Sequence, residues 1–78
     1  MKHFKVLGSG CRNCETTANL IKTAAEQAGI DIEIEKITDV AQIMSYGVMS
    51  TPGVVVDDKV VHAGGVPRID TVRKWISG

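Results

Sequence analysis

Two cysteines separated by two residues are the feature of this chain best suited to chemistry. Cys11 and Cys14 enclose Arg12 and Asn13. A disulfide between them closes a very small loop, so it would constrain the unfolded chain little and stabilise the fold little. In a cytosolic chain, cysteines at this spacing indicate either redox chemistry or metal binding.

The flanking sequence predicts that a strand, a turn and a helix position this pair. Polar and apolar residues alternate over Lys2–Leu7, which is typical of a strand, and the glycines of 8–10 allow a tight turn. Residues 14–28 contain no Gly or Pro, have apolar residues at helical spacing, and are followed by Gly29 as a C-cap. Cys11 is therefore expected at the mouth of the helix and Cys14 one turn inside it, on the same face.

This position predicts different roles for the two thiols. The helix N-terminus carries a partial positive charge and unpaired N–H groups, which favour a thiolate at Cys11, so its pKa should lie below the usual value of roughly 8.5. Arg12 adds a permanent positive charge beside it. Cys11 is thus the expected nucleophile, which forms a mixed disulfide with a partner, and the more shielded Cys14 is the expected resolving thiol.

The rest of the chain predicts an α/β fold. Residues 30–37 alternate isoleucine with charged residues, as a strand with one apolar face does. Asp39 begins a short helix that ends near Gly47, Val54–Val56 forms a third strand, and a turn at 57–59 leads into a fourth. A last helix follows Pro67. The order βαβαββα predicts a four-stranded mixed sheet with a parallel first pair and helices on both faces.

Length and composition limit the functional classes. The 78 residues suit a single domain, 1–78, and 44% of them are hydrophobic, enough for an ordered core. Nine basic and nine acidic side chains cancel, with no basic block, which argues against a nucleic-acid partner. The longest apolar run is three valines, so we expect no membrane span, no signal peptide and a cytoplasmic location.

Three motifs give the chain a specific resemblance. They are the turn Gly10-Cys11-Arg12-Asn13-Cys14, the segment Ser50-Thr51-Pro52-Gly53 before the third strand, and Gly64-Gly65 before the last helix. With them the chain resembles the thioredoxin-like superfamily over essentially its whole length, and most closely its very small bacterial and archaeal redox-active disulfide proteins.

The resemblance implies a thiol–disulfide oxidoreductase that needs no cofactor. It would act as a protein-disulfide reductase on a disulfide-containing protein or small molecule, and a separate reductase would recharge it. In that superfamily the proline is cis and packs against the disulfide, while the preceding residue offers backbone hydrogen bonds to the substrate. These roles fall on Pro52 and Thr51.

The chain also departs from the superfamily pattern. Thioredoxins typically have Trp-Cys-Gly-Pro-Cys, whereas Gly10 precedes this pair and Arg12 and Asn13 lie within it. Lys5 stands near the position where thioredoxins usually have a buried acidic residue, about six residues before the first cysteine. The residues after Gly64-Gly65 support glutathione binding only weakly.

The alternative is a soft-metal carrier that binds copper or mercury through Cys11 and Cys14, because thiolates bind such metals well. Small carriers of this kind have the order βαββαβ and a methionine two residues before the first cysteine, where this chain has Ser9. His3 and His62 fit no common zinc-site spacing, so we predict no metal ligands. Met44 and Met49 are expected in the core or lining a pocket.

Overall fold

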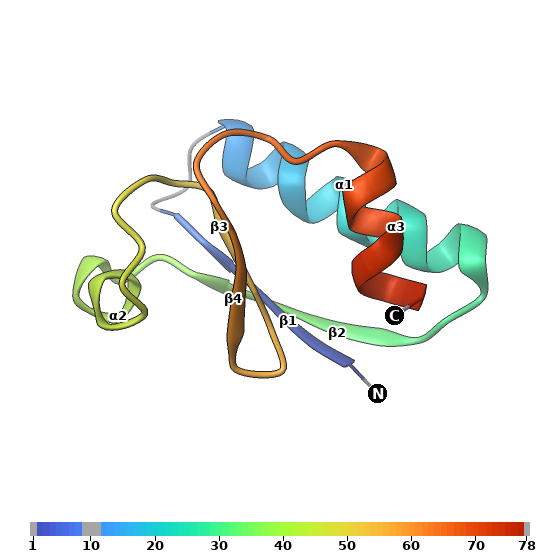
Figure 1. Ribbon diagram of the computed structural model, residues 1–78, viewed down its shortest axis with the longest axis horizontal. Coiled ribbons are helices and arrows are strands. Elements are labelled where there is room, and N and C mark those ends of the chain that lie inside the picture. The colour runs from blue at the N-terminus through green and yellow to red at the C-terminus, as the bar shows by residue number, and fades with distance from the viewer. Residues whose placement is uncertain (1, 9–11, 78) are drawn as a thin grey trace.

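The computed structural model describes residues 2–8 and 12–77, drawn as ribbons in Figure 1. The described elements follow the predicted order βαβαββα. They are β1 (Lys2–Leu7), α1 (Arg12–Ala28), β2 (Ile32–Ile37), α2 (Val40–Ser45), β3 (Gly53–Val56), β4 (Lys59–Ala63) and α3 (Ile69–Ser77).

The strands form one mixed sheet in the order β2-β1-β3-β4. As predicted, β1 and β2 are parallel, which requires a crossover connection, and α1 provides it. Strand β3 runs antiparallel to both β1 and β4. The β3–β4 hairpin turns at Asp57 and Asp58, whose φ angles are 48° and 69°. Two successive positive φ values are characteristic of a tight two-residue hairpin turn.

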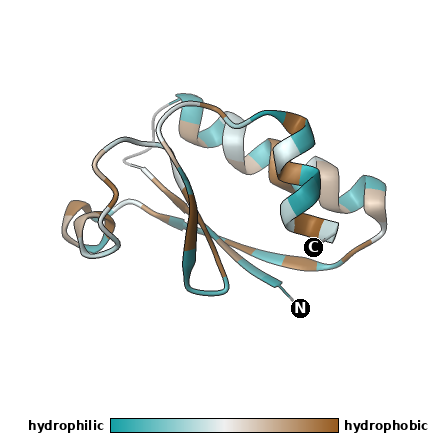
Figure 2. Cartoon of the chain, in the orientation of Figure 1, coloured by the Kyte–Doolittle hydropathy of each residue, from teal (hydrophilic) through white to brown (hydrophobic). Residues whose placement is uncertain are grey.

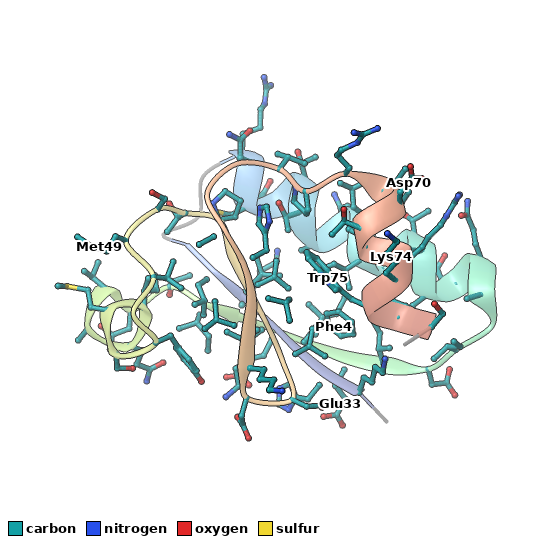
Figure 3. The ribbon with its side chains drawn as sticks, viewed as in Figure 1. Phe4, Glu33, Met49, Asp70, Lys74 and Trp75 are labelled. Carbon is teal, nitrogen blue, oxygen red and sulfur yellow. The ribbon has the colours of Figure 1, made fainter. Side chains whose placement is uncertain are left out.

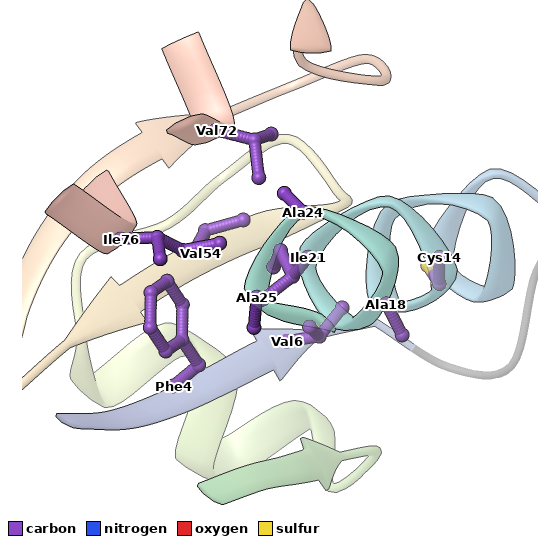
Figure 4. Packing of buried hydrophobic residues seen from close by; sticks show 10 residues of the cluster. All are labelled: Phe4, Val6, Cys14, Ala18, Ile21, Ala24, Ala25, Val54, Val72 and Ile76. Carbon is purple, nitrogen blue, oxygen red and sulfur yellow. The ribbon is translucent and has the colours of Figure 1, made fainter. Parts of the chain in front are cut away.

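Helices cover both faces of the sheet, so the fold-class prediction is confirmed. Helices α1 and α3 pack on one face and α2 lies on the other (Figure 1). Successive residues of a strand point to opposite faces. Val54 accordingly belongs to the core under α1 and α3, shown in Figure 4, and Val55 to the smaller core under α2. Both valines are fully buried, which explains why β3 contains no polar residue.

The ends of the helices follow from local sequence. Gly29 has a φ of 68° and its N–H donates to the carbonyl of Glu26 at 3.1 Å, as expected of a C-cap glycine. Asp39 caps α2, because its carboxylate accepts the N–H of Ala41 at 3.0 Å. No helix in the described part of the chain has the length and hydropathy needed to cross a bilayer.

Strand β2 begins two residues later than predicted. The N–H of Ile30 donates to the carbonyl of Ala25 at 3.0 Å and so belongs to the end of α1. Pairing with β1 starts where Ile32 meets Lys2. The alternation of residues 30–37 therefore predicts the strand correctly, but the helix cap determines where it begins.

Candidate active site

Cys14 is the member of the cysteine pair that the structure describes. It is the third residue of α1, it is 6% exposed, and it is disulfide-bonded. Its side chain lies at the end of the core under α1, beyond Ala18 (Figure 4). Cys11 and Gly10 lie outside the described residues, so the predicted position of Cys11 at the helix mouth is not tested. Arg12 begins α1 and is exposed.

Gly8 lies against the Cys14 side chain and leaves no room there for a side chain of its own. A Cβ atom built on Gly8 would lie 2.1 Å from Sγ of Cys14 and 3.2 Å from its Cβ. The N–H of Gly8 donates to the carbonyl of Ile37 at 2.9 Å, which holds this backbone against the end of β2. Gly8 is not among the described glycines with positive φ, so contact rather than conformation requires glycine here. The sequence predicts only a turn at Gly8, and no local pattern reveals this contact.

The segment before β3 completes this part of the site. The Thr51–Pro52 peptide bond is cis, as predicted. Pro52 is buried and its carbonyl accepts the N–H of Gly64 at 2.9 Å. Thr51 is exposed, and its Cβ lies 3.7 Å from the point that a Cβ of Gly8 would occupy. Cys14, Gly8 and Thr51 therefore meet at one end of the sheet, although they come from three separate parts of the chain.

The second glycine motif also reaches this end of the sheet. Gly64 has a φ of 86°, and a Cβ there would lie 3.1 Å from Cβ of Ser50. The loop after β4 consequently packs against the segment that carries the cis-proline. The structure thus brings together three of the features that carried the resemblance: Cys14, Thr51-Pro52 and Gly64.

An apolar groove extends from Thr51 over the α2 side of the molecule. It has a volume of about 290 Å³. Its lining residues are Val40, Ile43, Met44, Val48, Met49 and Thr51. Met49 is 98% exposed and Met44 is 70% exposed, so these methionines line a pocket rather than fill the core. Figure 2 shows the hydrophobic residues of α2, and Figure 3 shows Met49 on the far side of the sheet from Trp75.

Lys5 faces the α2 side of the sheet, opposite the face that carries Cys14. Its Nζ donates to the Tyr46 hydroxyl at 2.8 Å and lies 3.8 Å from a carboxylate oxygen of Asp58. The hydrogen bond to Tyr46 is the main cause that raises the pKa of Lys5 above its ordinary value, and the nearby Asp58 adds to it. Lys5 therefore joins β1 to the end of α2.

The two histidines are engaged away from the cysteine site. Nε2 of His3 lies 3.1 Å from a carboxylate oxygen of Glu35, across the β1–β2 pair. Nε2 of His62 lies 2.8 Å from the carbonyl of Gly65, and its ring centroid lies 5.9 Å from that of Trp75. Within residues 2–8 and 12–77, no three His, Cys, Asp or Glu side chains converge as a metal site.

Three features together define a thioredoxin-like protein. They are a mixed sheet covered on both faces, a cis-proline before β3 and a disulfide-bonded cysteine in the first turn of α1. Comparison with known proteins agrees. The family model described as a thioredoxin domain matches residues 2–77. A thioredoxin of Methanocaldococcus jannaschii is 40% identical over 71 residues, which cover 91% of this chain and 81% of the relative. A thioredoxin of Methanothermobacter thermautotrophicus is 32% identical over 77 residues, which cover 99% of this chain and all of the relative.

The chain belongs to the thioredoxin family. The prediction of a thiol–disulfide oxidoreductase is therefore confirmed. Nothing in these comparisons favours a soft-metal carrier, and the observed order βαβαββα differs from the βαββαβ order of such carriers.

Proposed function

We propose that this protein is a protein-disulfide reductase in which Cys11 is the nucleophile and Cys14 the resolving thiol. The observation that carries the proposal is the disulfide-bonded, buried Cys14 in the first turn of α1, directly beside Gly8 and Thr51. The positive end of α1 and the charge of Arg12 favour the thiolate form of Cys11. The cytoplasmic location remains a prediction.

The reaction takes place in two exchange steps. The Cys11 thiolate attacks one sulfur of the substrate disulfide, which forms a mixed disulfide and expels the other substrate sulfur as a thiolate. The Cys14 thiolate then attacks the Cys11 sulfur and expels the second substrate thiolate. The substrate gains two electrons and two protons, and the enzyme is left with a Cys11–Cys14 disulfide. A reductase of the cell must return it to the dithiol.

Thr51 and Pro52 are proposed to position the substrate. The carbonyl of Pro52 already accepts the N–H of Gly64, so the backbone of the exposed Thr51 is the better candidate to bond an extended substrate segment. The apolar groove begins at Thr51, and none of the described residues that line it is charged. It therefore suits an apolar side chain next to the substrate cysteine.

Single cysteine variants test the proposal. Cys14→Ser should accumulate a mixed disulfide with a protein substrate such as insulin, because the resolving step is blocked, and mass spectrometry should locate the bond at Cys11. Cys11→Ser should neither reduce the substrate nor trap it, and serves as the matched control. A Cys14→Ser protein that turned over substrate at the normal rate would show that the two-cysteine mechanism is wrong.

A further inference from the structure

We propose that Gly8 is a positioning residue that sets the redox potential of the cysteine pair by making room for the Cys14 sulfur in its disulfide form. This inference rests on the proposed function, because it takes Cys14 as one member of the redox pair. It assigns a role in the chemistry to a residue whose sequence context indicates only a turn.

The space beside Gly8 is too small for a side chain. A Cβ on Gly8 would lie 2.1 Å from Sγ of Cys14. Non-bonded heavy atoms normally stay roughly 3.5–4.0 Å apart, so one of the two groups must move by more than 1 Å. The backbone of Gly8 is held by its hydrogen bond to Ile37, at 2.9 Å. Cβ of Thr51 also lies near, 3.7 Å from the same point. The sulfur therefore has to yield.

The Cys14 sulfur can move away from position 8 in one redox form only. In a disulfide, the position of Sγ is fixed by bonds to both cysteines. In the dithiol, the Cys14 side chain can rotate about its Cα–Cβ bond to another staggered rotamer. A small cavity of about 40 Å³, lined by Cys14 and Gly8 together with Val6 and Lys36, offers room for this movement. A side chain at position 8 therefore destabilises the oxidised form more than the reduced form.

The consequence follows from the half-reaction, in which the disulfide takes up two electrons and two protons to give two thiols. Destabilising the disulfide alone makes its reduction more favourable. Gly8→Ala should therefore shift the equilibrium constant with a dithiothreitol or glutathione buffer at least tenfold toward the dithiol. A tenfold change corresponds to a midpoint potential about 30 mV less negative.

The experiment measures the midpoint potential of the wild type and of Gly8→Ala in these buffers. The reduced fraction is determined by alkylating the free thiols and counting the labels by mass spectrometry. Gly53→Ala is the matched control, because Gly53 pairs with Leu7 at the same end of the sheet. A Cβ there would lie 3.0 Å from Cγ1 of Val48 and would meet no sulfur among its nearest neighbours. Gly53→Ala should lower the stability of both redox forms and leave the equilibrium constant within twofold of wild type.

An unchanged potential in Gly8→Ala, with both redox forms destabilised equally, would overturn the inference. If oxidised Gly8→Ala does not fold, the substitution is made in a Cys14→Ala background. In that background Gly8→Ala should lower the urea midpoint of unfolding far less, because the Cys14 sulfur is gone. An undiminished loss of stability would overturn the inference too. Failure of the proposed function looks different, because the wild type itself would then show no reversible two-electron transition.

Discussion

Replacing Met44 and Met49 with glutamine is expected to slow the reduction of protein disulfides without changing the thiol chemistry. Both side chains line the apolar groove that starts at Thr51, and they are 70% and 98% exposed in the free protein. Full burial of a methionine side chain contributes about 1.5–3 kcal/mol. A substrate that covers roughly half of each side chain gains about 1 kcal/mol per residue, or about a fivefold change in binding.

The double variant should therefore lower kcat/KM for a protein substrate by roughly 25-fold. The assay compares insulin with a small soluble disulfide, whose reduction should keep its wild-type rate because it is too small to reach the groove. Val61→Thr is the control, since Val61 is an exposed apolar residue of β4 that does not line the groove. Equal losses with the two substrates, or no loss with insulin, would refute the assignment of the groove to substrate binding.

Two further predictions concern the attachment of α2, which carries part of the groove. The pKa of Lys5 is higher in the folded protein than its ordinary value of 10.5. The bond from Lys5 to Tyr46 therefore stabilises the fold fully below pH 10.5, and this stabilisation is lost as the pH rises through the higher folded pKa. The difference in unfolding free energy between the wild type and Lys5→Met should accordingly shrink between pH 8 and pH 11 in urea titrations, and a constant difference would contradict this. Asp39→Ala should cost about 1 kcal/mol in the same titration at pH 7, because the cap on Ala41 is lost, whereas Asp39→Asn keeps an accepting oxygen and should cost little.

The fold could be predicted from the sequence because its signals are local. The alternation of β2, the valines of β3, the cap at Asp39 and the glycine after α1 each depend on neighbouring residues only. The exact pairing could not be predicted. Val54 pairs with His62 and Val55 with Val60, so Val61 is an extra residue in β4. Such a bulge in an edge strand depends on contacts across the sheet, and the sequence carries no turn signal for it.

The site could be predicted only in part, for the same physical reason. The cysteine spacing and the proline are visible in the sequence, and the cis bond before Pro52 is present. The contact of Gly8 with Cys14 and the bond from Lys5 to Tyr46 join residues from different elements. Glycine and lysine have many other uses in a chain, so their residue types alone do not indicate these partners.

The arrangement separates the chemistry of the protein from its recognition of substrates. Cys14 belongs to the core under α1, while the groove lies on the α2 side of the sheet, and Thr51 is where the two regions meet. Substitutions that share no contacts have independent free energies. Gly8→Ala should therefore shift the potential equally in the wild type and in the Met44→Gln, Met49→Gln background, and the preference for protein over small substrates should be the same with either residue at position 8. A potential that depended on the methionines would show that the two regions are coupled through Thr51.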